Sequence, residues 1–297
     1  MIKRIVNISK ASFISLKSKQ LVVKQEGDCV SQIIIEDLGV LILENNQTTI
    51  TQGAIIACQK NNVAIILCDE RHLPYSLIQP LTEANNLHSK TLKIQMSASN
   101  STKNRIWKSI VRQKIIEQNT TLNIFGSHSN HLQRLASEVK SGDNENKEAQ
   151  AAKLYWKILM GDDFRRDFNL NGVNSILNYG YAVIRAVLAR AIVGTGLHSA
   201  IGVHHSNQYN GFCLADDIME PFRPWVDAVV YELVNINGHK EINIDVKRSL
   251  LNLIHQKVEY RGKVMPFLIS THRLAACLKA NLAREEKVFE YPKRLIE

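Results

Sequence analysis

The chain changes character just after the stretch Val63-Ala64-Ile65-Ile66-Leu67-Cys68-Asp69-Glu70, in which an apolar run ends at two acidic residues. A short apolar run bounded by polar residues favours a buried strand. Pro74 and Pro80 follow, and from Leu87 onward the apolar residues recur at helical spacing. The stretch therefore predicts the last strand of a β-rich region that precedes a mostly helical one.

The residues before this stretch favour short strands. Alternating or apolar runs cover residues 12–17, 20–25, 31–35 and 40–43, and Gly, Asp or Asn residues separate them. Strand-length runs at about ten-residue spacing, broken by turn residues, are typical of a small β-sheet or sandwich. One helix, from Thr51 to Asn61, is expected to interrupt the strands.

Helical periodicity dominates the rest of the chain, as in residues 103–116, where Ile106, Ile110 and Ile115 alternate with charged residues. Further helices are expected over residues 147–160, 173–193, 225–234, 246–258 and 266–285. The sequence thus predicts an α+β protein with two domains. A small N-terminal β-sheet or sandwich domain covers residues 1–80, and a larger all-α C-terminal domain covers residues 81–297, with the boundary near 75–90.

The charge balance favours a polyanionic partner. Lys and Arg number 37 against 28 Asp and Glu in 297 residues, which gives a net charge of +9. Basic surface attracts phosphates, so nucleic acid is a partner that this charge favours. A basic protein without such a partner has the same balance, so the charge alone does not decide between the two.

The cysteines support neither a disulfide framework nor a zinc ribbon, since they are five in number, scattered and without a C-x-x-C pair. Most have apolar neighbours and are expected to be buried thiols in a reducing compartment. No signal-peptide apolar region follows the N-terminus, and no apolar run reaches the roughly 18 residues that a membrane span needs. We therefore expect a cytoplasmic protein with no membrane partner.

Three segments carry residues that could hold a divalent cation, and the first contains Glu148. It follows the polar loop 138–147 in the first turn of an expected helix, where free N–H groups and the helix dipole favour a carboxylate. Ala152 leaves open space beside it, and Tyr155 could close one wall. The alternative is an ordinary glutamate at a helix N-terminus.

The second segment contains the adjacent residues His204 and His205. Neighbouring histidines in a loop point in different directions, so at most one of them normally serves a given site. Neutral imidazole is a common metal ligand, but a structural histidine pair is the more frequent case.

The third segment contains Asp216, Asp217 and Glu220. Asp217 and Glu220 are three residues apart, so one helical turn would place both on one face, although Pro221 disfavours helical geometry at Glu220. These clustered charges either surround a cation or are solvated or paired with Arg223. Their apolar neighbours favour a cation.

The three segments together offer two or three carboxylates and one imidazole. Such a donor set selects Mg²⁺ or Mn²⁺ over Zn²⁺. On a basic protein, a cation of this kind is typical of a phosphodiester enzyme.

Four basic residues are candidates for DNA contacts, and for each the alternative is a solvated charge on a helix: Arg165, Arg166, Lys247 and Arg248. Asn174 and Asn178 are four residues apart on an expected helix. They could hydrogen-bond inside the site or cap neighbouring backbone.

Several segments are similar to those of one known family. In the helical region they are Glu148-Ala-Gln-Ala-Ala-Lys-Leu-Tyr-Trp156, Asn174-Ser-Ile-Leu-Asn-Tyr-Gly-Tyr181, Gly202-Val-His-His205 and Leu214-Ala-Asp-Asp-Ile-Met-Glu-Pro-Phe-Arg-Pro224, and in the β region they are residues 35–43 and 68–74. The chain resembles the universal CRISPR-associated integrase family, and most closely the form found in type II systems.

The resemblance implies a β domain followed by a helical domain, and it implies the site residues. The family's metal ligands map onto Glu148, His205 and Glu220, with Asp217 as a second acidic residue that assists. The choice of His205 over His204 rests on this match. Glu220 stands where many relatives have Asp, which leaves a ligand in place but extends its reach.

The resemblance also implies the reaction. The 3′-hydroxyl of a captured double-stranded DNA fragment would attack a phosphodiester at the end of a CRISPR repeat, and two such transesterifications would insert the fragment as a new spacer. Without a proper acceptor, the same site would act as an endonuclease on branched DNA. The implied assembly is a homodimer that joins the small partner protein Cas two in a heterohexamer, helped by a DNA-end-binding ring protein and an RNA-guided effector nuclease.

Two other functions remain open from the sequence. One is a stand-alone branched-DNA nuclease that uses the same metal site. The other is a non-catalytic DNA-binding scaffold, and the presence of all three candidate ligands argues against it. A zinc hydrolase is less well supported, because the chain has no His-x-x-x-His pattern or cysteine cluster.

Overall fold

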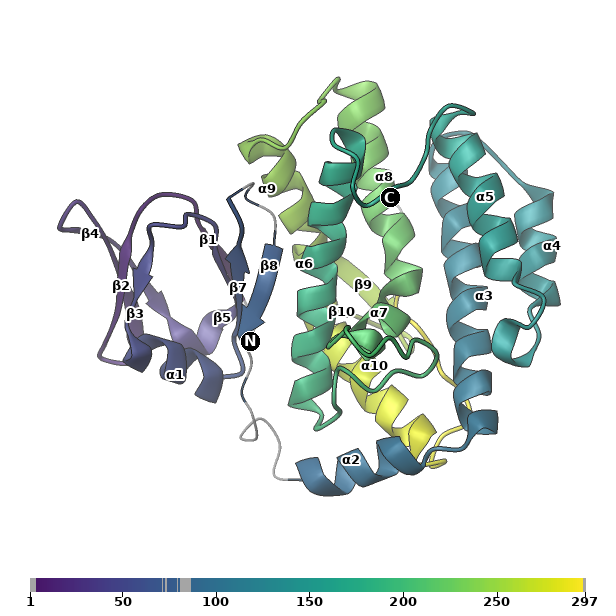
Figure 1. Ribbon diagram of the computed structural model, residues 1–297, viewed down its shortest axis with the longest axis horizontal. Coiled ribbons are helices and arrows are strands. Elements are labelled where there is room, and N and C mark those ends of the chain that lie inside the picture. Colours follow the sequence, from purple (N-terminus) through teal and green to yellow (C-terminus); the bar gives the residue numbers. More distant parts are fainter. Residues whose placement is uncertain (1–3, 71, 73, 79, 81–86, 296–297) are drawn as a thin grey trace.

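The structure is a computed structural model that describes residues 4–70, 72, 74–78, 80 and 87–295. Strands fill the N-terminal part and helices fill most of the remainder (Figure 1), which confirms the predicted α+β class. The predicted boundary between residues 80 and 81 adjoins residues 81–86, which lie outside the described residues. Arg71 and Leu73, from the similar segment 68–74, also lie outside them.

Two four-stranded sheets form the N-terminal part. The first has the order β1-β5-β7-β8, in which β1 (Arg4–Ile8), β5 (Leu38–Leu43) and β7 (Ala64–Cys68) are parallel and β8 (Pro74–Ile78) is antiparallel to β7. The second has the order β4-β3-β2-β6, built from β2 (Phe13–Lys17), β3 (Gln20–Gln25), β4 (Asp28–Ile34) and β6 (Thr49–Ile50). The helix expected from Thr51 to Asn61 is α1 (Gln52–Lys60), and Thr51 is its N-cap.

β5 and β7 are buried on both faces of their sheet. Successive side chains of a strand point to opposite faces, so Leu41 and Ile65 join the core between the two sheets. Val40, Ile42 and Ile66 join the core of the helical part instead. This double burial explains the continuous apolar run at residues 63–68. The core that the two sheets share makes them a sandwich, one of the two arrangements that the sequence predicted.

β8 begins at Pro74, where the sequence suggested that the strands had ended. Proline is tolerated at the first residue of a strand and on an edge strand, since its missing N–H is not needed there. β8 occupies the edge of its sheet, next to β7. Pro74 therefore marks the start of an edge strand. Pro74 and Pro80 together also mark the change from strands to helices along the chain.

Helices make up most of the remaining chain. In order they are α2 (His88–Ser97), α3 (Asn100–Ile124), α4 (Asn130–Glu138), α5 (Lys147–Met160), α6 (Val173–Gly194), α7 (Cys213–Met219), α8 (Arg223–Tyr231), α9 (Ile244–Asn252) and α10 (Phe267–Leu282). Short turns adjoin them at η2 (Ser141–Asp143), η3 (Glu220–Phe222), η4 (Glu232–Ile236) and η5 (Leu253–His255). The predicted helices at 147–160 and 173–193 are confirmed almost to the residue.

The prediction that this part is all-α is wrong, because it contains a small sheet of order β10-β9-β11. β9 (Lys257–Tyr260) and β10 (Lys263–Pro266) form a hairpin, and β11 (Lys293–Arg294) pairs with β9. Arg261 and Gly262 form the hairpin turn with φ values of 51° and 73°, the left-handed angles that a two-residue hairpin favours. The helix predicted over residues 246–258 therefore ends early, and its last residues pair as a strand.

α6 lies on the side of the helical part that faces the strand region, next to β7 and β8 (Figure 1). Among the described residues, it is the helix long and apolar enough to cross a membrane, but 78% of its most apolar window is buried inside the structure. Burial of this extent is typical of a core helix. α6 packs against α7, α8 and α10, and so carries the elements that position the site described below.

A buried ion pair joins the strand region to the helical part. Glu44, just after β5, and Lys247, on α9, are both buried, and Lys247 Nζ lies 2.6 Å from Glu44 Oε1. Asn7 donates to the other Glu44 oxygen at 2.6 Å. The prediction of Lys247 as a DNA contact assumed an exposed side chain, and the structure contradicts that position. A sequence gives the charge of a lysine but not its burial.

We expect Lys247→Ala to lower the free energy of unfolding by about 3–5 kcal/mol, because Glu44 would stay buried without its cation. Arg248→Ala is the control, since Arg248 pairs with Asp245 at the surface and such a pair is worth about 1 kcal/mol at most. Urea denaturation of both variants measures the difference. A loss of DNA affinity in the Lys247 variant at unchanged stability would contradict this assignment.

Candidate metal centre

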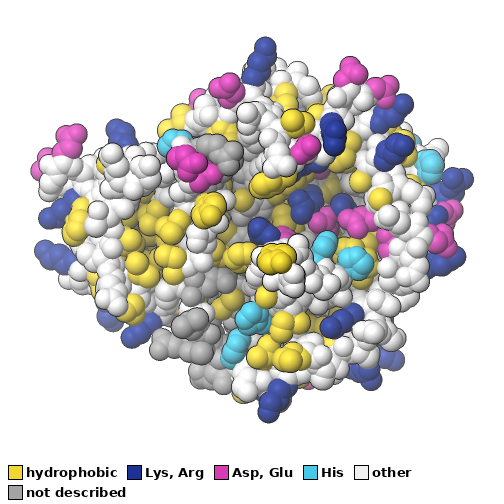
Figure 2. Space-filling model, in the orientation of Figure 1, with side chains coloured by type: hydrophobic (Ala, Val, Ile, Leu, Met, Phe, Trp, Pro, Cys, Tyr) yellow, Lys and Arg dark blue, Asp and Glu magenta, His cyan; other side chains and the backbone are white. Residues whose placement is uncertain are grey.

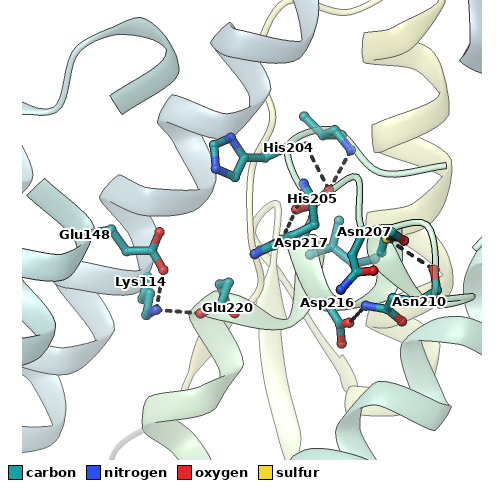
Figure 3. Close-up of polar contacts among 12 residues, drawn as sticks. Lys114, Glu148, His204, His205, Asn207, Asn210, Asp216, Asp217 and Glu220 are labelled. Atoms are coloured by element: carbon teal, nitrogen blue, oxygen red, sulfur yellow. Dashed lines mark hydrogen bonds and ion pairs between the residues drawn. The ribbon is translucent and has the colours of Figure 1, made fainter. Parts of the chain in front are cut away.

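Glu148 lies in the first turn of α5, as predicted. The loop before this helix caps it: Asp143 accepts hydrogen bonds from the N–H groups of Lys147 (2.9 Å) and Glu148 (3.0 Å). The N-cap side chain of Asn146 accepts a further bond from the N–H of Ala149 (3.3 Å). Because these caps satisfy the free N–H groups of the first turn, the Glu148 carboxylate is available for contacts outside its own helix (Figure 3).

Lys114, on α3, lies between the Glu148 and Glu220 carboxylates (Figure 3). Its Nζ is 2.6 Å from Glu148 Oε1 and 2.5 Å from Glu220 Oε2. The second oxygen of Glu220 accepts a hydrogen bond from Arg223 Nε at 2.8 Å. One ammonium group thus joins the two carboxylates that the sequence indicated as metal ligands.

The charges of this cluster support one another. Burial opposes ionisation of Glu220, but attraction by Arg223 and Lys114 outweighs it and holds the pKa of this carboxyl below its usual range. Burial likewise opposes the charge of Lys114, and attraction by Glu220 and Glu148 raises its pKa. Although Lys114 is close, the buried Oε2 of Glu220 has no donor in hydrogen-bond geometry, so this contact is an ion pair without a directed hydrogen bond.

Pro221 does not prevent helical geometry at Glu220, whose φ of −50° and ψ of −44° are those of an α-helix. α7 ends at Met219, the short turn η3 follows, and α8 begins at Arg223. The prediction of disfavoured geometry is therefore wrong. In this geometry Glu220 forms ion pairs with Lys114 and Arg223, and Phe222 is buried. Glu220 nevertheless lies next to a helix start, as expected.

Asp217, on α7, organises the histidine loop. Its completely buried carboxylate accepts hydrogen bonds from the backbone N–H groups of Val203 (2.5 Å), His204 (3.0 Å) and His205 (3.1 Å). It also bonds His205 Nδ1 at 2.6 Å. A Cβ atom at Gly202 would lie 2.2 Å from the His205 carbonyl oxygen and 2.8 Å from Asp217 Oδ2, so only glycine lets the loop wrap the carboxylate this closely.

His204 and His205 point in different directions, as expected, with ring planes 85° apart. His204 stacks on Trp107, with ring centroids 4.0 Å apart. His205 instead uses Nδ1 for Asp217, which leaves its other ring nitrogen for a ligand. The hydrogen bond to Asp217 raises the pKa of His205 against the effect of partial burial, and the charges of Glu220 and Glu148 add to the increase.

The structure brings the candidate ligands together in two pairs. Glu148 and Glu220 meet at Lys114, and His205 meets Asp217 beside them (Figure 3). Among the described residues, no three His, Cys, Asp or Glu side chains form a group that could hold a metal ion as they stand. The ammonium of Lys114 occupies the space between the carboxylates where a shared cation would lie.

A cavity of about 270 Å³ opens beside these pairs. Its lining includes Arg166, Phe168, Asn178, Arg185, His205 and Glu220. Figure 2 shows acidic, basic and histidine side chains gathered on this face of the helical part. The cavity can therefore accept a charged group next to the candidate ligands.

Arg166 is fixed inside this cavity by two asparagines. It donates to Asn174 Oδ1 at 2.8 Å and to Asn178 Oδ1 at 2.6 Å. Asn174 also bonds the backbone of Arg165 and Asp167, so both roles considered for the asparagines occur. Arg165 is exposed on the surface.

Asp227 lies in the protein interior behind the site. It accepts hydrogen bonds from the hydroxyls of Tyr155, at 2.9 Å, and Tyr181. Burial raises the pKa of Asp227 to about 7 against the effect of these hydrogen bonds. Tyr155 is completely buried, so it supports the site from inside and does not form a wall of the cavity.

The sequence did not single out Lys114, although it contains a signal for it. Ile106, Ile110, Lys114, Gln118 and Leu122 follow one another at four-residue spacing along α3. A charged residue within such a stripe is directed toward the interior and needs a partner there. The stripe predicts a buried lysine, but it does not name Glu148 and Glu220 as the partners.

The sequence profile of the family described as CRISPR associated protein Cas1 matches residues 5–257. This chain belongs to the Cas1 family. It is 35% identical over 278 residues to the CRISPR-associated endonuclease Cas1 of Neisseria meningitidis serogroup C, with 93% of this chain and 90% of that protein covered. That match fits the type II-like form indicated by the motifs. A Cas1 endonuclease of Francisella tularensis subsp. novicida is 24% identical, with 94% and 95% covered.

Solved structures share the fold of this Cas1 protein. A casposase bound to an integration product gives a TM-score of 0.79 at 20% identity, covering 98% of this chain and 93% of that one. A Cas1 protein from Thermotoga maritima gives 0.77 at 15% identity, covering 97% and 99%. A chain of a Cas6-RT-Cas1–Cas2 complex gives 0.77 at 17% identity, covering 99% of this chain and 36% of that one.

Asp217→Asn should destabilise the protein by on the order of 3 kcal/mol, because the loop loses charge-assisted hydrogen bonds and an amide N–H would face backbone donors. Asp245→Asn is the control, since Asp245 is exposed and its loss leaves no buried donor. Denaturation midpoints compare the two. Equal midpoints would show that Asp217 does not hold the histidine loop.

Proposed function

We propose that this Cas1 protein is a divalent-metal-dependent DNA endonuclease and integrase that inserts captured DNA fragments as new spacers at CRISPR repeats. The observation that carries the proposal is the convergence of Glu148 and Glu220 on one cationic group, beside a histidine oriented by a buried carboxylate. Relatives named CRISPR-associated endonuclease Cas1 support it. A similar fold in a casposase bound to an integration product also supports it.

Mg²⁺ or Mn²⁺ would be held by Glu148, His205 and Glu220. These donors fit a hard cation, because they offer carboxylate oxygens, one of them buried without a hydrogen-bond donor, and one ring nitrogen. Asp217 would assist by orienting His205, and its direct ligation of the metal stays a prediction. When bound, the metal would neutralise and polarise the phosphodiester.

The protein residues around the cavity would bind and orient the DNA. Arg166 is pre-oriented by Asn174 and Asn178, so its guanidinium would contact a phosphate oxygen with little loss of side-chain entropy. Arg165 and Arg248 are exposed, with side-chain exposures of 82% and 67%, and they remain candidates for contacts to the DNA backbone.

The nucleophile would come from the DNA. Tyr155 supplies a hydroxyl within the Glu148 motif, but it donates to the buried Asp227, and burial raises its pKa well above the usual value. In the proposed reaction, the 3′-oxygen of the fragment forms a bond to phosphorus while a phosphorus–oxygen bond of the repeat breaks. The number of phosphodiesters is conserved, so joining needs no ATP.

The proposed assembly is cytoplasmic. It contains double-stranded DNA, a homodimer of this chain and the small partner Cas2 in a heterohexamer, with a DNA-end-binding ring protein and an RNA-guided effector nuclease as further partners. The fold shared with a Cas6-RT-Cas1–Cas2 complex supports the Cas2 part. We also propose that residues 1–80 and 81–297 are separate domains, because the strand region has a core of its own.

His205→Ala should reduce DNA cleavage and strand transfer by about 100-fold or more, because it removes an oriented ligand. His204→Ala should have a much smaller effect, since His204 stacks on Trp107 and bonds Asp217 only through its backbone N–H. Both activities are measured on branched DNA and on a repeat-bearing plasmid, with circular dichroism to verify folding. The reverse order of the two effects would show that the wrong histidine is assigned.

Joining should require a free 3′-hydroxyl on the incoming DNA. Purified protein, Cas2, divalent metal and a repeat-bearing plasmid would be incubated with fragments that end in 3′-hydroxyl or 3′-deoxy. We expect product only from the 3′-hydroxyl fragment, and none with Glu148→Ala protein. Hydrolysis without joining would favour a stand-alone nuclease, and equal joining of both ends would contradict the mechanism.

A further inference from the structure

Lys114 lies where the Glu148 and Glu220 carboxylates converge. α3 supplies the lysine, α5 supplies Glu148, and the turn η3 supplies Glu220. The Lys114 side chain is 12% exposed, and the two carboxylate side chains are 25% and 7% exposed. Without a cation between them, two poorly solvated carboxylates would repel each other.

A second lysine shows what an ordinary bridge between two glutamates looks like in this protein. Lys147 is also 12% exposed, and its Nζ lies 2.9 Å from Glu138 and 3.4 Å from Glu145. Those glutamates are 42% and 46% exposed, so water screens their charges. Lys114 differs because it compensates charges that water reaches poorly.

The contact with Glu220 is electrostatic more than directional. Lys114 Nζ is 2.5 Å from Glu220 Oε2, yet this oxygen lacks a donor in hydrogen-bond geometry. Lys114 Nζ contacts one oxygen of each carboxylate, through a hydrogen bond to Glu148 and an ion pair to Glu220, and a divalent ion suits such a pair of oxygens as well as an ammonium. The same carboxylate oxygens cannot bind the Lys114 ammonium and a metal ion at the same time.

We infer that Lys114 is a built-in cation that holds the metal-free site together and that a divalent metal must displace. The inference rests on the proposed metal site and adds an intramolecular competitor to it. A cavity of about 210 Å³ lies beside the cluster, and its lining includes Gln118, Ala152 and Trp156 as well as Lys114, Glu220 and Arg223. The flexible lysine chain can move into this space when its ammonium leaves the carboxylates.

The test is the affinity for Mn²⁺ alone, measured by the loss of the free-ion signal in electron paramagnetic resonance. Lys114→Met keeps the chain length and removes the charge, so it should bind Mn²⁺ roughly tenfold or more tightly than the unchanged protein. Its metal-free form should melt at a lower temperature and gain more from Mn²⁺. Lys147→Met, the matched control, should bind Mn²⁺ as the unchanged protein does.

Glu148→Ala removes a candidate ligand, so it tests the metal site separately from the role of Lys114. Equal or weaker Mn²⁺ binding by Lys114→Met, with Mn²⁺ binding that is lost in Glu148→Ala, would overturn the role of Lys114 and leave the metal site intact. Mn²⁺ binding that is the same in all variants, Glu148→Ala included, would overturn both the site and the inference.

A measurement on the unchanged protein keeps the inference testable if Lys114→Met does not fold. An amine-reactive reagent and mass spectrometry report how accessible each lysine is. Mn²⁺ should increase the labelling of Lys114 and leave that of Lys147 unchanged. Labelling of Lys114 that stays constant or decreases with Mn²⁺ would show that its ammonium remains on the carboxylates.

Discussion

The burial of the Glu220 carboxylate is the constraint around which the helical part is arranged. A buried charge must be paired, and the two partners come from different elements: Arg223 from the start of α8 and Lys114 from the middle of α3. Lys114 in turn fixes the place of α5 through Glu148. Three residues before Glu220, Asp217 gathers the histidine loop. The short segment from Asp217 to Glu220 thus contacts Lys114 and the histidine loop directly.

The fold could be predicted where local pattern and burial agree. β2, β3, β5, β7 and α1 follow from runs broken by turn residues, and α5 and α6 follow from their helical periodicity. The β9–β10 hairpin was missed because Val258 also continues the helical pattern before it, and pairing with β11 is a contact far along the sequence. The partners of a strand decide such cases, and a single sequence does not name them.

The candidate site also contains residues that the sequence predicted and residues that it missed. Glu148, His205 and Glu220 were predicted as ligands because motifs carry them, and the structure places their side chains in one region. Lys114 was missed because its importance arises from two glutamates that lie 34 and 106 residues further along the chain. Lys247 was misplaced for the related reason that its partner, Glu44, belongs to the strand region. Charge can be counted from a sequence, whereas its pairing depends on the folded contacts.

The strand β5 has a further consequence for how this protein can be divided. Every one of its six residues is buried, and the side chains from Val40 to Leu43 alternate between two different cores. A fragment that ended after the strand region would expose Val40, Ile42, Ala64 and Ile66 as one apolar strip on a sheet. Such a strip favours self-association. Evolution can therefore exchange this sandwich between proteins only together with a helical surface that covers it.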